Sequence, residues 1–149
     1  EICPVLKLCE SKGSIKRKIV KKIVIQKVTV AFVISYKDSY LIHKNSESLL
    51  QNLYCFPLSE FNKVNNDFEK KKYLDQTVFK WTEKKKLKNP YSLVGEVNHK
   101  FSHFQLKVLI VKLKLSSKIM FNGFFWLTKE ELNEKAVSKL MVKIREKIE

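Results

Sequence analysis

The amino-acid sequence predicts an α/β (α+β) fold in which a mixed β-sheet is flanked by helices. Runs of β-branched residues and two segments with helical periodicity follow in the order strand, strand, irregular segment, helix, strand, strand, strand, helix. A chain of 149 residues is long enough for one domain with a sizeable core. Its three cysteines form no disulfide framework, and no apolar run is long enough to cross a bilayer. We therefore expect a soluble protein of a reducing cytoplasm.

A hairpin and a helix are predicted in the first half of the chain. Residues 27–36 are rich in valine, isoleucine and threonine, and Asp38-Ser39 turns the chain into a second strand over 40–42. Residues 46–61 are less regular, because a proline interrupts their apolar cluster. The spacing over 67–86 predicts a helix, which a proline stops, with an apolar stripe of Phe68, Leu74, Val78 and Trp81.

Three strands and a second helix are predicted in the second half. Residues 92–99 and 106–115 form two strands, and three lysines within the second of them indicate a wetted edge or face. A turn leads into a short strand over 124–127. Thr128 and Glu131 then form a capping box for a helix to the C-terminus. Its buried stripe is expected to consist of Leu132, Ala136, Val137, Leu140, Met141, Ile144 and Ile148.

The net charge of +15 favours a polyanion such as nucleic acid as partner. Only two of the 30 basic residues are arginine, and a lysine-rich composition is also typical of proteins from AT-rich genomes, whatever they bind. The distribution of charge is more specific, because residues 10–26 contain a single acid. We interpret this segment as a basic interdomain linker, either a solvated tether or one that neutralises phosphates. Its phosphate-binding candidates are Lys16, Arg17, Lys18, Lys21 and Lys22.

Three segments resemble one family of DNA-repair enzymes. Residues 97–106 read VNHKFSHFQL and resemble the Phe-Ser-His loop with which adenine DNA glycosylases of the MutY family probe 8-oxoguanine opposite a mispaired adenine. Residues 49–58 resemble that family's Leu-Leu-x-Gly-Leu-Trp-x-Phe-Pro segment, with Asn52 in place of the glycine and Tyr54 in place of the tryptophan. Asparagine tolerates a left-handed backbone, and tyrosine keeps the aromatic bulk. Residues 126–144 are similar to the family's terminal helix.

The resemblance implies that residues 27–149 are the Nudix-like (MutT-like) C-terminal domain of such a glycosylase, acting in base excision repair. Phe101, Ser102 and His103 would then bind 8-oxoguanine, and this chain would hold no catalytic residue. The implied partners are double-stranded DNA with 8-oxoguanine–adenine mispairs and the N-terminal glycosylase domain of the same protein, which would carry the active site. The implied place of action is the DNA in a bacterial cytoplasm, away from membranes.

The chemistry of the loop agrees with this role. Compared with guanine, 8-oxoguanine carries an extra carbonyl oxygen at position 8 and a hydrogen on the neighbouring ring nitrogen. The hydroxyl of Ser102 can donate or accept, and a backbone amide beside it adds a donor. His103 adds a further polar ring, while Phe101 either anchors the loop or wedges against the base stack. A plain connection between two strands is the alternative interpretation of these residues.

The cysteines near the N-terminus resemble part of a metal motif in the same family. Cys3 and Cys9 have the spacing of the last two ligands of its [4Fe–4S] cluster motif, so residues 1–9 would be the end of that motif. Such a cluster needs four thiolates, so we expect it only in the full-length protein and no cofactor in this fragment. Cys55 lies in an apolar run and is expected to be a core thiol.

Three other functions remain open from the sequence. A Nudix hydrolase of nucleoside diphosphate derivatives would need clustered carboxylates for divalent metal. The chain instead offers scattered acids among lysines in the corresponding stretch, namely Glu60, Asp67, Glu69, Asp75 and Glu83. A zinc site would have to use His99, His103 and a cysteine, without four ligands at usable spacing. A generic nucleic-acid- or partner-binding module would present an extended basic and aromatic surface rather than one probing loop.

Overall fold

The centre of the sheet is a parallel pair of long strands that lie far apart in the sequence. The computed structural model describes residues 25–46, 50–64 and 66–149. In it, β1 (Ile25–Tyr36) pairs in parallel with β5 (Phe104–Lys114), and Ile25 lies opposite Phe104. On the other side of β5, β4 (Tyr91–Lys100) is antiparallel and forms the edge of the sheet. The lysines of β5 therefore do not mark an edge strand, because β5 lies inside the sheet.

The remaining strands extend the sheet on the side of β1. The predicted hairpin joins β1 to β2 (Ser39–Lys44). Strand β2 also pairs with the two-residue β3 (Tyr54–Cys55), which the sequence did not predict, and with β6 (Phe124–Thr128). The resulting mixed six-stranded sheet agrees with the predicted fold class.

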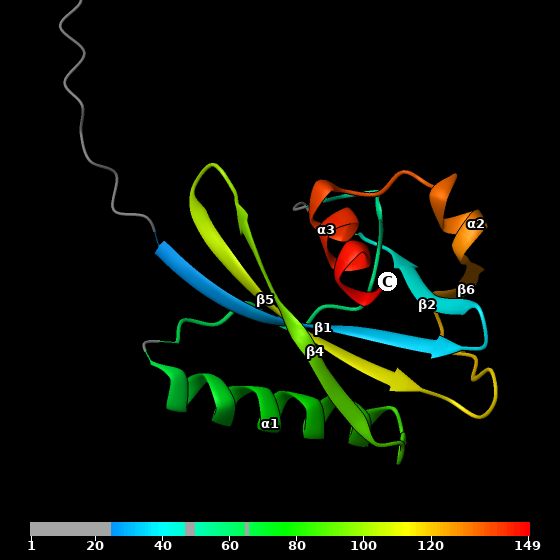
Figure 1. Ribbon diagram of the computed structural model, residues 1–149, viewed down its shortest axis with the longest axis horizontal. Coiled ribbons are helices and arrows are strands. Elements are labelled where there is room, and N and C mark those ends of the chain that lie inside the picture. The colour runs from blue at the N-terminus through cyan, green and yellow to red at the C-terminus, as the bar shows by residue number, and fades with distance from the viewer. Residues whose placement is uncertain (1–24, 47–49, 65) are drawn as a thin grey trace, which may run out of the picture.

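Helices cover the two faces of the sheet, and each face has its own apolar core (Figure 1). On one face, α1 (Asp67–Lys84) packs over β1, where Leu74 and Val78 are buried. On the other, α3 (Lys139–Ile148) packs against β4 and buries Leu140, Met141, Ile144 and Ile148. No helix in the described residues is long and apolar enough to span a membrane.

The predicted first helix is present, but its apolar stripe is narrower than the sequence indicated. The ring of Trp81 stacks on Phe32 of β1 with 4.3 Å between ring centroids, and Phe32 has no exposed surface. Phe68, by contrast, is 78% exposed, so its assignment to the buried stripe is wrong. It lies in the first turn of α1, two residues after the N-cap Asn66.

The irregular segment after β2 covers the free edge of β1. Residues 57–62 run antiparallel to β1, with the amide of Phe32 donating to the carbonyl of Pro57 at 2.9 Å. Asn52 has a φ of 63°, so the left-handed backbone expected at this position is confirmed. Cys55 is buried as predicted, and burial raises the pKa of its thiol to about 11.

The C-terminal segment forms two helices rather than the one that was predicted. Thr128 and Glu131 make the predicted capping box, but it opens the short helix α2 (Lys129–Asn133). The chain then leaves the helical path, and Ser138 caps α3 as a new start. Between them, the carbonyl of Ala136 accepts a hydrogen bond from the amide of Tyr54. Ala136 is exposed, in contrast to the predicted stripe, whereas Val137 is half-buried and packs against the core with the rest of that stripe.

Candidate nucleic-acid interface

The β4–β5 hairpin carries the loop that the sequence singled out. The two strands pair up to Lys100 and Gln105, and the amide of Phe101 donates to the carbonyl of Phe104 at 2.9 Å. Only Ser102 and His103 remain outside this last hydrogen bond, and we call these two residues the tip. The predicted position of the loop between two strands is therefore confirmed.

Aromatic rings hold in place the two residues that flank the tip, Phe101 and Phe104. The ring of Phe101 lies 4.7 Å from that of His99 and 4.8 Å from that of Phe104. Phe104 in turn contacts Phe61 at 5.9 Å, and the ammonium of Lys27 lies over its ring at 4.8 Å. Phe101 is half-buried against the core on the α3 face. Of the two roles considered for Phe101, this packing favours the anchor.

The two tip side chains are exposed to solvent. Within the part of the chain that the structure describes, neither the Ser102 hydroxyl nor the His103 ring makes a hydrogen bond. Both can therefore donate to or accept from an approaching base edge without first breaking an internal bond. A polar tip on a rigid aromatic support suits a probing element, since the loop loses little conformational freedom on binding.

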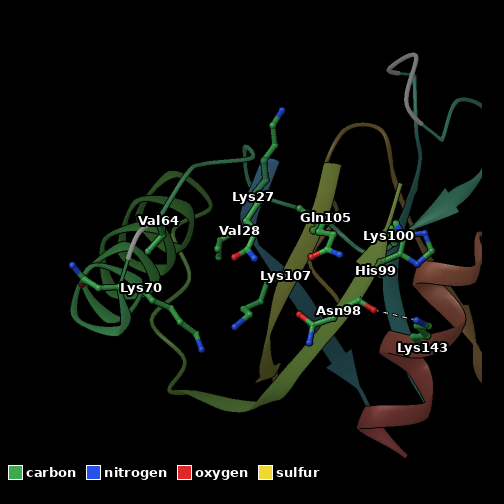
Figure 2. A pocket seen from close by; sticks show the side chains of 13 residues that line it. Lys27, Val28, Val64, Lys70, Asn98, His99, Lys100, Gln105, Lys107 and Lys143 are labelled. Atoms are coloured by element: carbon green, nitrogen blue, oxygen red, sulfur yellow. Dashed lines mark hydrogen bonds between the residues drawn. The ribbon is translucent and has the colours of Figure 1, made fainter. Parts of the chain in front are cut away.

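A pocket of about 570 Å³ lies directly beside the tip. Figure 2 shows polar side chains of β1, β4 and β5 around it, with Lys70 of α1 on one side and Lys143 of α3 on the other. The Lys143 ammonium donates to the carbonyl of Asn98, on the edge strand, at 3.1 Å. The lining residues are Gln26, Lys27, Val28, Val64, Asn66, Lys70, Asn98, His99, Lys100, Gln105, Leu106, Lys107 and Lys143.

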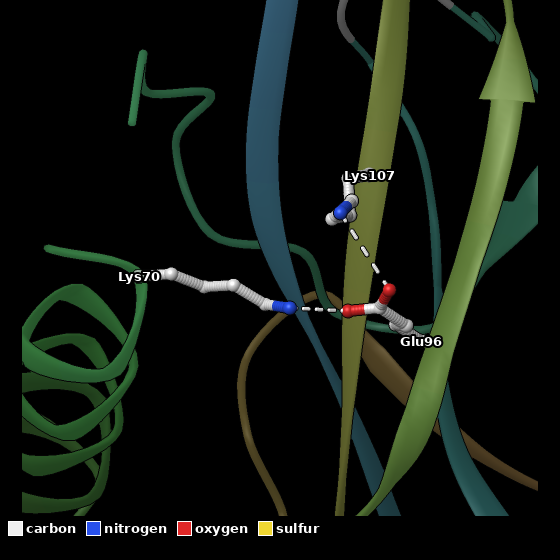
Figure 3. A network of polar contacts seen from close by, with 3 residues as sticks. All are labelled: Lys70, Glu96 and Lys107. Carbon is white, nitrogen blue, oxygen red and sulfur yellow. Dashed lines mark hydrogen bonds and ion pairs between the residues drawn. The ribbon is translucent and has the colours of Figure 1, made fainter. Parts of the chain in front are cut away.

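One carboxylate lies close to the pocket without lining it. Glu96 of β4 binds the ammonium groups of Lys70 and Lys107, the latter at 3.6 Å (Figure 3). The hydrogen bond from Lys70 lowers the pKa of Glu96, partial burial opposes the shift, and the charge of Lys107 adds to it. Glu96 therefore stays ionised at neutral pH and joins α1 to the edge strand.

His99 makes the stability of this region dependent on pH. Burial lowers the pKa of His99, and the positive charges of Lys143 and Lys139 lower it further. In the unfolded chain the imidazole titrates near 6.5, so below that pH the unfolded state binds more protons. We expect the free energy of unfolding to fall as the pH decreases from 7 to 5.5, and to fall less in His99→Gln.

Urea unfolding at several pH values measures this effect. The matched control is His103→Gln, which changes an exposed imidazole at the tip. If His99→Gln and the wild type lose the same free energy between pH 7 and 5.5, His99 does not contribute to the pH dependence.

Several predicted site residues lie outside the described part of the chain. These are the cysteines Cys3 and Cys9 and the basic linker residues Lys16, Arg17, Lys18, Lys21 and Lys22. Conversely, the sequence did not single out the pocket lysines, which are Lys27, Lys70, Lys100, Lys107 and Lys143. Lys100 directly precedes Phe101-Ser102-His103, and Lys107 follows shortly after. Their closeness to the loop motif could have indicated these two lysines as part of the site. Lys70 and Lys143 come from distant helices, and only the fold brings them to the pocket.

The acids and histidines considered for metal binding do not come together in the described residues. Among residues 25–46, 50–64 and 66–149, no group of three His, Cys, Asp or Glu side chains is placed to hold a metal ion. Asp75, for example, accepts a hydrogen bond from the Tyr91 hydroxyl at 3.0 Å. The pocket beside α1 presents lysines, whereas hard divalent cations need oxygen ligands.

Comparison with known proteins gives a family and a relative. Residues 29–147 match the family model described as NUDIX domain. An adenine DNA glycosylase of Buchnera aphidicola subsp. Schizaphis graminum (strain Sg) is 31% identical over 125 residues, covering 77% of this chain and 32% of that protein. The chain thus spans about a third of the length of that relative.

Solved structures share the fold at low sequence identity. The C-terminal domain of mouse MUTYH, solved in complex with human PCNA, has a TM-score of 0.63 at 20% identity and covers 82% of this chain and 86% of that one. The NUDIX domain of Shewanella oneidensis NrtR, solved with ADP ribose, has a TM-score of 0.62 at 14% identity, covering 83% and 86%. A MutT protein from Methanosarcina mazei Go1 has a TM-score of 0.61 at 14% identity, covering 85% and 95%.

Proposed function

Since this chain belongs to the NUDIX domain family and is 31% identical to an adenine DNA glycosylase, we propose that it is the 8-oxoguanine-recognition domain of such an enzyme. In this role the domain reads the oxidised base, while a catalytic domain elsewhere in the same protein removes the mispaired adenine. Extracting a base costs a few kcal/mol in stacking and pairing. Contacts to 8-oxoguanine offset part of that cost and restrict excision to adenines opposite the lesion.

The observation that carries this proposal is the exposed tip of Ser102 and His103, which stands on a cluster of aromatic side chains. The hydroxyl of Ser102 and the adjacent backbone amide offer an acceptor or donor and a second donor to the altered base edge. Phe101 serves as the anchor that holds the tip in place, and the cationic pocket next to the tip favours a nucleic acid.

Ser102→Ala tests the proposal in the full-length enzyme. One neutral hydrogen bond contributes roughly 0.5–1.5 kcal/mol, so the preference for 8-oxoguanine–adenine over guanine–adenine pairs should fall about 2- to 13-fold. The loss should be larger when His103→Ala is added. Adenine excision on both duplexes measures the preference. Ser116→Ala, an exposed serine in the connection after β5, is the matched control. A folded double variant that keeps the full preference would reduce the tip to a simple connection between strands.

A Nudix hydrolase activity is the alternative that family membership raises. Such an enzyme would have to hold divalent metal next to its substrate phosphates. Here the pocket beside α1 is lined by ammonium and amide groups, and Glu96, behind it, is already bound by two lysines. This donor set does not fit a hard cation, so we favour recognition over hydrolysis.

Three further parts of the proposal concern the full-length protein. Cys3 and Cys9 would supply two of the four thiolates of a [4Fe–4S] cluster, with the other two from the preceding chain. Residues 10–26 would link the glycosylase domain to this one, and their lysine and arginine side chains would contact phosphates. Iron analysis of the full-length protein and of a variant with both cysteines replaced by serine tests the cluster.

A further inference from the structure

The pocket beside the tip has an excess of positive charge that the folded domain leaves uncompensated. Among the described residues, five lysines line it, and no aspartate or glutamate does. Within the same part of the chain, Lys100 and Lys143 have no ion-pair partner, whereas the Lys27 ammonium lies over the Phe104 ring at 4.8 Å. Folding has therefore gathered several ammonium groups around one concave surface, which by itself is unfavourable. Such an arrangement suits an anionic ligand that supplies the missing charge.

Glu96, the carboxylate that binds two of these lysines, cannot neutralise both of them. Glu96 is shared between Lys70 and Lys107, so one negative charge serves two positive charges. These two lysines come from α1 and β5, and Glu96 holds them at the wall of the pocket (Figure 3). The described lining residues together with Glu96 keep a net positive charge.

The uncharged lining residues indicate the kind of anion. Four of them carry carboxamides, which donate hydrogen bonds to phosphate oxygens, namely Gln26, Asn66, Asn98 and Gln105. Of the residues that the structure describes, three aliphatic ones line the pocket, and no phenylalanine, tyrosine or tryptophan does. The surface thus offers charge and hydrogen-bond donors, but no large flat apolar wall on which a base could stack.

The position of the pocket identifies the source of the phosphates. Lys100 and Gln105 line it and are also the last paired residues before the loop that carries Ser102 and His103. A nucleotide whose base meets the tip would place its own backbone at this rim. Resting on the function proposed above, we propose that the pocket is a groove for the phosphate backbone of the DNA strand whose base lies at the tip.

The test compares two variants of the 149-residue chain with equal charge change. Lys100→Gln/Lys143→Gln removes from the groove two ammonium groups that have no ion-pair partner among the described residues. Lys112→Gln/Lys114→Gln removes two from β5 outside the groove, toward the end of the strand opposite the tip. Binding to a duplex with an 8-oxoguanine–adenine pair and to its guanine–adenine counterpart is measured by fluorescence anisotropy over a salt series.

We expect the groove variant to lower the slope of log affinity against log salt by about 1.8, since each lost phosphate contact contributes about 0.9. If binding at 1 M salt is unchanged, this corresponds to a roughly 30-fold loss of affinity at 0.15 M salt, equal for the two duplexes. The control variant should change the slope by less than about a quarter of that. Glu96→Gln should act in the opposite direction and steepen the slope, because it releases Lys70 and Lys107.

Several outcomes would overturn the groove. These are a wild-type chain that binds neither duplex, equal slopes in the groove and control variants, or a groove variant that loses lesion preference without a change in slope. Inorganic diphosphate, titrated by calorimetry, provides a separate arm. Loss of diphosphate binding in the groove variant with an unchanged duplex slope would assign the pocket to a free nucleotide instead.

Failure of the groove is distinguishable from failure of the proposed function. A wild-type chain with equal affinity for both duplexes, whose slope still falls in the groove variant, keeps the groove and removes lesion reading by the isolated domain. The opposite result is a preference for the lesion that disappears in Ser102→Ala/His103→Ala, together with equal slopes in the two lysine variants. It would keep lesion reading by the tip and remove the groove.

Discussion

Phe32→Ala is expected to lower the free energy of unfolding by about 3–5 kcal/mol. Phe32 is fully buried in the central strand β1, and its ring stacks on Trp81 of α1 at 4.3 Å between centroids. The change removes the ring from the core of this face and leaves Trp81 without its stacking partner, so one of the contacts that hold α1 on the sheet is lost. Denaturant unfolding followed by tryptophan fluorescence measures the loss.

A matched control exists on the same side of the molecule. Phe68 lies on α1 and is 78% exposed, so Phe68→Ala should change the stability by no more than about 0.5 kcal/mol. Similar losses for the two alanine variants would mean that α1 does not pack on β1 through the Phe32–Trp81 stack.

Phe101→Ala is expected to affect both stability and recognition. The ring is half-buried and contacts His99 and Phe104, so its removal should cost about 2 kcal/mol of unfolding free energy. Without this anchor the tip is no longer held in one position. The preference for 8-oxoguanine should therefore fall at least as far as in Ser102→Ala, although the altered side chain is not at the tip.

Phe101→Leu separates anchoring from wedging. Leucine keeps much of the buried apolar volume, so an anchor should recover most of the stability and much of the preference. A wedge between bases would instead give stability unchanged in Phe101→Ala, with a loss of DNA binding in both variants. Unfolding in urea and adenine excision by the full-length enzyme, on the same set of variants, decide between the two.

Local patterns predicted the elements whose burial follows from their own sequence. The β-branched run of β1 and the lysine-rich helix α1 are present at nearly the expected bounds, and Asn52 adopts the expected left-handed backbone. Each depends on interactions within a few residues, which periodicity and side-chain type report directly. The tip was found in the same way, because its motif is contiguous.

Long-range contacts decided what the sequence did not predict. The apolar stripe from Leu132 to Ile148 reads as one helix, but the backbone of Ala136 binds Tyr54, and Ser138 caps a new start. β5 contains lysines yet lies inside the sheet, where Lys107 can pair with Glu96. The groove is a further case, because Lys70 and Lys143 reach it from two helices on opposite faces of the sheet.

The parallel pairing of β1 with β5 has a consequence for how the domain is synthesised and folds. Every rung of this ladder joins one of the first described residues to one from the last third of the chain, as in Ile25 with Phe104 and Ser35 with Lys114. A nascent chain that ends before residue 104 has no partner for this side of β1. Closing so long a loop before any contact compensates for it makes folding slow and exposes the apolar strand meanwhile. The central sheet therefore forms only after β5 has left the ribosome, and the Ser102–His103 tip takes its place beside the sheet in the same step.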